Sequence, residues 1–253
     1  PAPGGNIFPL QQRVLEMDVD TGELPVLVAA GLDFEARAAQ GPGVKVVYGQ
    51  NRRKFRENLH RHAATGVRGL ISFGVAGGLS PHLKPGDVIV ANAIITSGGI
   101  FRTCPVWSKS LLSSLPHARH LPVYGSEFTV MTAPEKRALW TATGAVAVDM
   151  ESSPVAEAAA DYGLPYAVLR VVLDPAERAI PPSALAAARE DGSTDRLAVV
   201  RALLKRPRDF AGLMRLARDS HKANRALLRS RQALGPFFGF LPLEAGEFSL
   251  NVK

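Results

Sequence analysis

Three carboxylates and one glycine-rich run follow apolar segments that have the composition of buried strands. Glu35, Glu151 and Asp174 each lie at or just beyond the end of such a segment, and Gly74-Val75-Ala76-Gly77-Gly78 follows another. An α/β sheet makes its sites at the carboxyl ends of its strands, so these residues are expected to gather at one edge. Three carboxylates there would suit a reaction that needs a proton donor for a leaving group, a base for a nucleophile and an acceptor for hydroxyl groups.

Each of these features also has a purely structural interpretation. A glutamate after a strand often stabilises the N-terminus of the next helix, which applies to Glu35 and Glu151. Asp174, which precedes Pro175, is typical of a turn. The glycine run has neither the dinucleotide-binding spacing nor a P-loop lysine, so its pattern alone predicts a tight turn that lets the backbone approach a ligand. The functional interpretation therefore depends on the three carboxylates lying together.

The apolar patterning predicts one α/β domain that positions these residues. Strands are predicted at 25–30, 44–48, 69–73, 87–96, 127–131, 145–150 and 166–173, and helices at 53–64, from Pro134 onwards, and at 152–162. Residues 97–121 are predicted to form a long loop with one helical turn. Strands that alternate with helices and are apolar on both faces indicate a sheet covered on both sides. The predicted divisions are an N-terminal arm (1–24), a catalytic core (25–180) and a C-terminal extension (181–253).

The C-terminal extension is predicted to be helical and strongly basic. Helices are expected at 197–205 and 210–228, followed by an aromatic tail at 235–242. Eleven Lys and Arg residues against two Asp residues between Arg196 and Arg231 give that segment a net charge of +9, which leaves −2 for the rest of a chain whose total is +7. The basicity therefore belongs to the extension and not to the predicted catalytic core.

Two interpretations fit this basic segment (196–231). It is either a solvated helical face that its leucines hold on the domain, or an interfacial helix that anionic lipid head groups attract. Exposed Phe237, Phe238 and Phe240 would fit the second interpretation. Nucleic acid is not expected as a partner, because no known motif and no aromatic–basic interleaving accompanies the charge.

Composition places the chain among ordinary globular proteins. It has 253 residues, 46% hydrophobic and 21% charged, which is enough to bury a substantial core. The single cysteine, Cys104, excludes an intramolecular disulfide framework and is interpreted as structural. No signal-peptide pattern and no membrane-spanning apolar stretch is visible, so a cytoplasmic protein is expected. The residue pattern predicts no metal site.

Three motifs resemble those of one superfamily, in order and in register. Phe73 to Leu79, with Leu83-Lys84-Pro85-Gly86-Asp87-Val88, is similar to the glycine-loop signature of the nucleoside phosphorylase and methylthioadenosine/S-adenosylhomocysteine nucleosidase superfamily. Val148-Asp149-Met150-Glu151-Ser152 resembles its ribose-binding Met-Glu motif, and Arg170-Val171-Val172-Leu173-Asp174 resembles its purine-site strand. The resemblance extends from about Leu24 to Asp174 and implies a central mixed, twisted sheet flanked by helices. Within the superfamily the chain most resembles the hopanoid-associated phosphorylases, whose C-terminal extension is like residues 181–234.

The resemblance implies a role for each motif residue in breaking a purine–ribose bond. Asp174 would donate a proton or hydrogen bond to purine N7 and read the 6-amino group, which eases departure of the base. Glu151 would accept hydrogen bonds from the ribose 2′- and 3′-hydroxyls and stabilise positive charge on the ring, with Met150 against the sugar. Glu35 matches the nucleosidase glutamate that activates water.

Further residues are assigned to substrate binding by the same resemblance. Val75, Gly77 and Gly78 belong to the glycine loop, Phe128 or Val130 would flank the base, and Arg170 either orients Glu151 or is purely structural. No cofactor is implied, although phosphate is a candidate co-substrate.

The chain departs from the superfamily pattern where a phosphate would bind. Val75 occupies a position at which many relatives carry Ser or Thr, and Ser72 occupies that of the phosphate-binding arginine of the phosphorylases. Loss of a hydroxyl and a guanidinium weakens the case for tight binding of a dianion, with Arg37 or a neighbouring subunit's arginine as a candidate replacement. The sequence leaves water and phosphate open as acceptors.

The resulting expectation is an enzyme that releases adenine from a nucleoside. The hopanoid subgroup implies adenosylhopane as the substrate, and the superfamily resemblance implies a homo-oligomer. Contact with the inner membrane face through the basic segment is expected only under the second of the two interpretations above. The alternatives are a general methylthioadenosine/S-adenosylhomocysteine-type nucleosidase, and a nucleoside- or lipid-binding protein without catalysis. A Rossmann oxidoreductase is disfavoured because the glycine spacing and the ribose-reading acidic residue are both missing.

Overall fold

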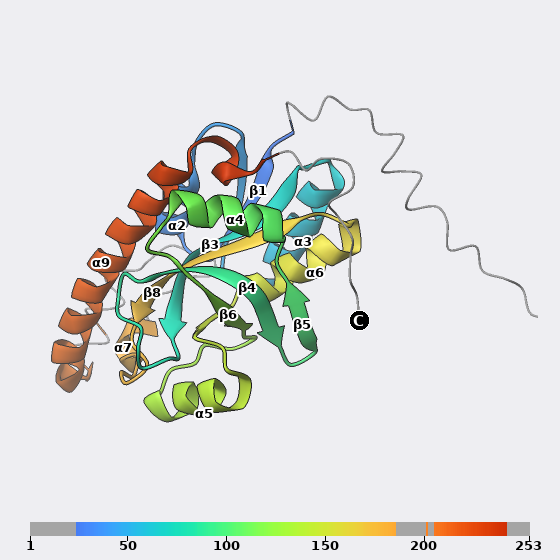
Figure 1. The fold of residues 1–253 in the computed structure, drawn as a ribbon. Helices are drawn as coiled ribbons and strands as arrows, with labels where there is room; N and C mark the ends of the chain where they lie inside the picture. The colour runs from blue at the N-terminus through green and yellow to red at the C-terminus, as the bar shows by residue number, and fades with distance from the viewer. Residues whose placement is uncertain (1–23, 186–200, 202–204, 242–253) are drawn as a thin grey trace, which may run out of the picture.

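The structure, a computed structural model, describes residues 24–185, 201 and 205–241. These residues form an eight-stranded sheet with helices packed around it (Figure 1). The strands are β1 (Val26–Ala30), β2 (Val44–Tyr48), β3 (Gly69–Gly78), β4 (Val88–Thr96), β5 (Gly99–Arg102), β6 (Arg119–Gly125), β7 (Ala147–Asp149) and β8 (Tyr166–Asp174). The helices are α2 (Asp33–Ala39), α3 (Arg52–Ala64), α4 (Pro105–Ser114), α5 (Ala133–Thr143), α6 (Ser152–Tyr162), α7 (Pro182–Leu185) and α9 (Phe210–Leu234), with 3-10 turns η1 (Pro207–Asp209) and η2 (Pro236–Gly239).

The sheet is mixed, and five of its strands form a closed circuit. Strand β3 pairs in parallel with β1 and β8 and antiparallel with β7, and β8 pairs antiparallel with β4. Strand β6 completes the circuit because it is parallel to both β4 and β7. Two buried clusters cover the sheet, one beneath α3 and α6, the other beneath α2, α4 and α9. The expected class, a single α/β domain with a mixed sheet flanked by helices, is confirmed.

Several predicted elements are present almost residue for residue. Strand β2 has the predicted bounds, α3 differs by one residue, and α6 coincides with the predicted helix. Gly163 ends α6 in the left-handed conformation, with φ of 62°, as its position after an alanine-rich run predicted. Pro134 lies in the first turn of α5, as expected.

Three of the local predictions are wrong. The glycine run continues β3 as a strand, because its residues pair with β8 on one side and β7 on the other. The segment predicted to be a loop, 97–121, contains β5, α4 and the first three residues of β6. Pro105 at the start of α4 is a helix-start signal. Residues 127–131 form no strand, since Ser126 makes local hydrogen bonds with the backbone N–H and C=O of Phe128.

The C-terminal extension packs on the domain. Helix α9 runs as one 25-residue helix along β8 and α2, six residues beyond its predicted end (Figure 1). The aromatic residues that follow it pack into or against the core, so they are not the exposed phenylalanines that would have fitted the lipid interpretation. Phe238 is fully buried with its ring 5.0 Å from that of Phe73, and the ring of Phe240 lies 4.9 Å from that of Trp107.

Some predictions fall outside the described residues. The N-terminal arm (1–24) is described only at Leu24, and of the helix predicted at 197–205 only Arg201 and Lys205 are described. In the part of the chain that the structure describes, no helix is long and apolar enough to cross a membrane.

Candidate active site

One cavity of about 280 Å³ lies where β1, β3, β7 and β8 end. Its lining contains eight of the ten predicted site residues: Glu35, Val75, Gly77, Phe128, Val130, Met150, Glu151 and Asp174. The other two, Gly78 and Arg170, lie behind the wall. A Cβ on Gly78 would lie 3.1 Å from the backbone oxygen of Asp174, and Arg170 is fully buried.

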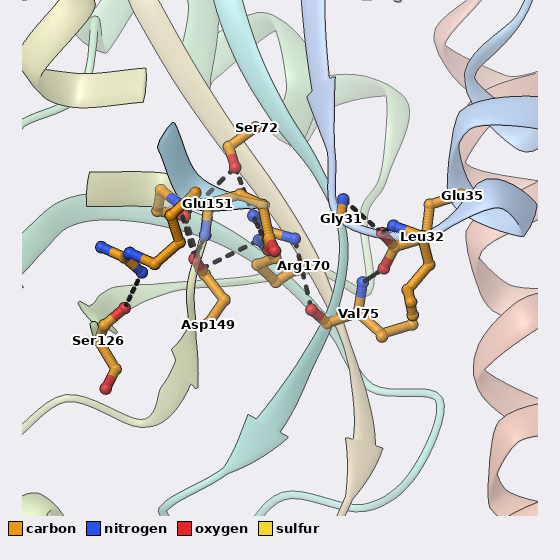
Figure 2. Close-up of polar contacts among 11 residues, drawn as sticks. Gly31, Leu32, Glu35, Ser72, Val75, Ser126, Asp149, Glu151 and Arg170 are labelled. Atoms are coloured by element: carbon orange, nitrogen blue, oxygen red, sulfur yellow. Dashed lines mark hydrogen bonds and ion pairs between the residues drawn. The ribbon is translucent and has the colours of Figure 1, made fainter. Parts of the chain in front are cut away.

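Glu35 is held by backbone amides from two elements. It lies at the third position of α2, where one carboxylate oxygen accepts the N–H groups of Gly31 (2.9 Å) and Leu32 (2.8 Å). The other oxygen accepts the N–H of Val75 on β3 (2.7 Å) (Figure 2). Burial raises the pKa of Glu35, while the Arg170 charge and the three amides act in the opposite direction. The predicted helix-terminal role and a position in the cavity wall are therefore compatible.

Glu151 and Asp149 share one buried arginine. Arg170 on β8 lies 3.0 Å from the Asp149 carboxylate through Nε and 3.3 Å from that of Glu151 through Nη2 (Figure 2). Burial alone would lower the pKa of Arg170, but the surrounding carboxylates raise it. Burial raises the pKa of Glu151 to about 7, Arg170 opposes this shift, and the charges of Glu35 and Asp149 add to it.

Asp149 fixes the start of the helix that follows Glu151. One of its oxygens accepts the N–H groups of Glu151 (2.9 Å) and Ser152 (2.7 Å), and the other accepts the Ser152 hydroxyl (2.5 Å). Asp149 therefore satisfies two of the free amides at the start of α6, which leaves the Glu151 carboxylate available to the cavity.

Ser72 is turned away from the cavity. It is fully buried, and its hydroxyl accepts a hydrogen bond from Nη2 of Arg170 (Figure 2). The residue at the position of the phosphorylase arginine thus supports Arg170 and does not line the site.

Asp174 is paired with a buried lysine. Nζ of Lys136, a residue of α5 with no exposed surface, contacts Oδ2 of Asp174 and also donates to the carbonyls of Pro175 (3.0 Å) and Arg178 (2.8 Å). Three acceptors satisfy the three ammonium protons. Burial raises the pKa of Asp174, and the Lys136 charge acts against that shift.

The C-terminal extension braces this part of the site. The guanidinium of Arg178, whose carbonyl accepts from Lys136, forms an ion pair with Asp219 of α9. Helix α9 therefore holds the segment that follows Asp174, although it does not line the cavity itself.

Two glycines allow the acidic groups to approach the sheet. A Cβ on Gly74 would lie 2.5 Å from Oε1 of Glu35 and 2.7 Å from Nη1 of Arg170, and one on Gly31 would collide with the Glu151 carboxylate. These glycines are required by close approach and not by a turn.

The remaining wall is largely apolar, with arginines at one side. Val130, Leu173 and Ile180 line it, and Phe128 is 77% exposed beside it. Arg52 also lines the cavity and donates to the Ser126 carbonyl at 3.2 Å.

Comparison with known proteins assigns the family. Residues 21–205 match the model of the phosphorylase superfamily, and the chain belongs to that superfamily. A methylthioadenosine/S-adenosylhomocysteine nucleosidase of Helicobacter pylori has a similar fold, with 15% identity and a TM-score of 0.55 over 81% of this chain and 96% of that one. A putative nucleosidase of the same type from Francisella philomiragia also has a similar fold. It is 17% identical, with a TM-score of 0.56 over 83% of this chain and 96% of that one.

A second enzyme type appears among the similar structures. Futalosine hydrolase of H. pylori is 18% identical, with a TM-score of 0.51 over 60% of this chain and 88% of that one. At these identities the likeness concerns the fold. No curated protein matches the chain significantly.

Three residues around the site were missed from the sequence. Lys136 lies on a helix whose other charges are exposed, and nothing in its spacing distinguishes it. Asp149 directly precedes the Met-Glu pair and had a recognisable signal, since an aspartate side chain commonly accepts the backbone N–H two residues on. Arg52 directly precedes the predicted helix 53–64 and is the first residue of α3, and only the fold brings it to the cavity.

Proposed function

We propose that this protein is an enzyme that cleaves the N-glycosidic bond of an adenine nucleoside. The observation that carries the proposal is the single cavity in which Glu35, Glu151 and Asp174 meet, each with a different set of partners. Amides hold Glu35, an arginine holds Glu151 and a lysine holds Asp174. Burying three carboxyl groups in one cavity costs free energy. Such an arrangement is typical of sites whose reaction develops and transfers charge.

The positions along β3 give the proposed orientation of the nucleoside. Gly74 lies against Glu35 and Arg170, whereas Gly77 lies near Asp174, three residues further along the strand. Three residues of strand span about 10 Å, which is comparable to the distance from the ribose hydroxyls to the far edge of a purine. The sugar therefore lies at Glu151 and the base at Asp174.

Each carboxylate has one proposed task in the reaction. Asp174, whose pKa burial raises, donates a hydrogen bond or proton to N7, so that the bonding electrons leave with a neutral base. Glu151, in its ionised form, accepts the 2′- and 3′-hydroxyls and stabilises the positive charge that develops on the sugar. Glu35 takes a proton from the attacking water.

Water is the proposed acceptor. The floor of the cavity holds Glu35, Asp149 and Glu151 against one guanidinium, that of Arg170, which already contacts two of them. A phosphate dianion would meet net negative charge there. Phosphate remains the second candidate because Arg52 lines the same cavity.

The proposed substrate carries an apolar group at the ribose 5′ position, with adenosylhopane as the preferred example. The resemblance to the hopanoid-associated phosphorylases supports this choice, and so does the apolar wall with an exposed phenylalanine, Phe128, at its edge. A general methylthioadenosine-type nucleosidase is the alternative, and a broad preference for small soluble nucleosides would favour it.

The test follows free adenine from 5′-methylthioadenosine, a 5′-alkyl adenosine and adenosylhopane, each with and without phosphate, in ¹⁸O-labelled water. Hydrolysis predicts adenine without phosphate and label at the anomeric hydroxyl. Asp174→Asn is expected to lower adenine release by roughly 100-fold or more, whereas Glu177→Gln, an exposed carboxylate three residues away, serves as the matched control. Absence of release from all three substrates would indicate a binding protein and contradict the proposal.

A further inference from the structure

Five cations form a continuous row along the outer face of α9. Arg215, Arg218, Lys222, Arg225 and Arg229 are all exposed, and their spacing of 3, 4, 3 and 4 residues keeps them on one side of a helix. At 1.5 Å per residue the row is about 21 Å long. The buried positions of α9, among them Ala223 and Leu227, face the domain, so the exposed cations lie on the opposite, outer face of the helix.

Within the part of the chain that the structure describes, no carboxylate neutralises the charge of this row. None of the five cations has an ion pair with a carboxylate among the described residues. The only acidic residue within α9, Asp219, is buried and paired with Arg178. Five like charges on adjacent turns repel one another. This arrangement therefore does not stabilise the helix if its outer face contacts only solvent.

Large apolar side chains are exposed beside the row. Phe210 is 57% exposed, Met214 46% and Leu228 41%. At 100° per residue, Phe210 and Leu228 fall at the same angle around α9 and Met214 lies 40° away, next to the cationic row. The outer face of α9 thus combines an apolar stripe with a cationic stripe.

We propose that the outer face of α9 is a docking surface for a membrane that contains anionic lipid. Cations next to exposed apolar residues on one helix are the pattern by which interfacial helices bind, because the cations attract lipid phosphates while the apolar side chains enter the acyl boundary. A nucleic-acid backbone would use the cations but not the phenylalanine, methionine and leucine. The proposal does not depend on the proposed reaction, since the row does not line the active-site cavity.

The test measures sedimentation of the full chain with phosphatidylcholine vesicles, with and without phosphatidylglycerol, in the absence of any nucleoside. Binding is expected only with phosphatidylglycerol and should weaken as salt is raised. Replacing Arg218, Lys222 and Arg225 by Gln should lower the partition coefficient by about 100-fold, from a factor of roughly five for each cation. Arg215 is left unchanged because it lines a second hollow next to Asp174.

The matched control replaces three exposed cations elsewhere, Lys54, Arg61 and Lys109, by Gln, which gives the same change in net charge. This control should retain binding, and both variants should retain the activity of the unmodified enzyme. Met214→Ser with Leu228→Ser should weaken vesicle binding without changing binding to duplex DNA.

Three results would overturn the proposal. The first is equal binding to both kinds of vesicle, or to neither. The second is DNA binding that is tighter than vesicle binding and is lost in the α9 variant, which would assign the row to nucleic acid. The third is self-association that disappears with the same three substitutions, which would assign it to a second copy of the chain.

Discussion

The Lys136–Asp174 pair gives a prediction whose size can be worked out from the structure. Lys136→Met would remove the only described cation in contact with the Asp174 carboxylate and would take one donor from each of the carbonyls of Pro175 and Arg178. The Pro175 carbonyl would keep the backbone N–H of Arg178. Lys136 has no exposed surface, so water does not replace the lost ammonium easily. Removing one partner of a buried pair costs about 3–5 kcal/mol.

The cost should depend on pH because Asp174 can take up a proton. Burial raises the pKa of Asp174 even with Lys136 present. Loss of the Lys136 charge would raise the pKa of Asp174 further. A carboxyl group with a raised pKa in the folded state stabilises the protein at low pH, and this contribution is lost as pH rises through the folded-state pKa. The variant is therefore expected to lose more stability at about pH 8 than at about pH 5.

Urea unfolding at these two pH values measures the effect. The neighbouring exposed cation provides the control, since Arg137→Met should change the free energy of unfolding by less than about 0.5 kcal/mol. The double variant Lys136→Met with Asp174→Asn should recover part of the loss, because no charge is then left unpaired. A loss that is independent of pH, with no coupling between the two substitutions, would refute the electrostatic reasoning. Activity gives a second readout, since the alkaline limb of kcat/KM should move to higher pH in Lys136→Met.

Three more predictions concern the cavity wall. Burial raises the pKa of Glu151 to about 7 from 4.5, so the folded state becomes less stable as pH rises through that range. The free energy of unfolding of Glu151→Gln, measured in urea, should therefore increase by about 2–3 kcal/mol relative to that of the unmodified protein between about pH 5 and pH 8. A difference that stays constant with pH would contradict this. Gly74→Ala would place a Cβ 2.5 Å from Oε1 of Glu35 and should reduce kcat at least tenfold. The control Gly98→Ala, whose Cβ would have no neighbour closer than 3.8 Å, should leave kcat unchanged. Equal activity in the two variants would show that Glu35 tolerates displacement. Phe128 is 77% exposed, so Phe128→Ala should change the free energy of unfolding by less than about 0.5 kcal/mol. The same substitution should raise KM for a 5′-alkyl adenosine more than KM for adenosine. An equal change in the two KM values would argue against an apolar 5′ site.

The sequence predicted those elements whose local signals agree with their tertiary surroundings. Helix α6 has alanines through its interior and a glycine at its end, and it forms where predicted. Strand β3 shows the opposite case, because its glycines signal a turn locally while β7 and β8 hold them in the sheet. Gly74 is required because Glu35 lies close to its backbone. The sequence alone does not distinguish such a glycine from one that forms a turn, because the contacting residue is distant in the chain.

The same limit applies to the site. The acidic residues of the motifs were predicted to lie together, and the structure places them around one cavity. The groups that set their charge come from elsewhere in the chain: Lys136 from α5 and, through Arg178, Asp219 from α9. These ion pairs join residues that are 38 and 41 positions apart, a separation over which no local pattern connects two residues.

The central claim is that the Glu35–Glu151–Asp174 cavity breaks the bond between adenine and ribose. The most direct test is the rate of adenine release from 5′-methylthioadenosine, measured by chromatography for the unmodified protein and for Glu151→Gln and Asp174→Asn. We expect release by the unmodified protein and a loss of at least about 100-fold in each variant, with the fold retained. Undiminished release in both variants, or intact nucleoside after prolonged incubation with the unmodified protein, would contradict it.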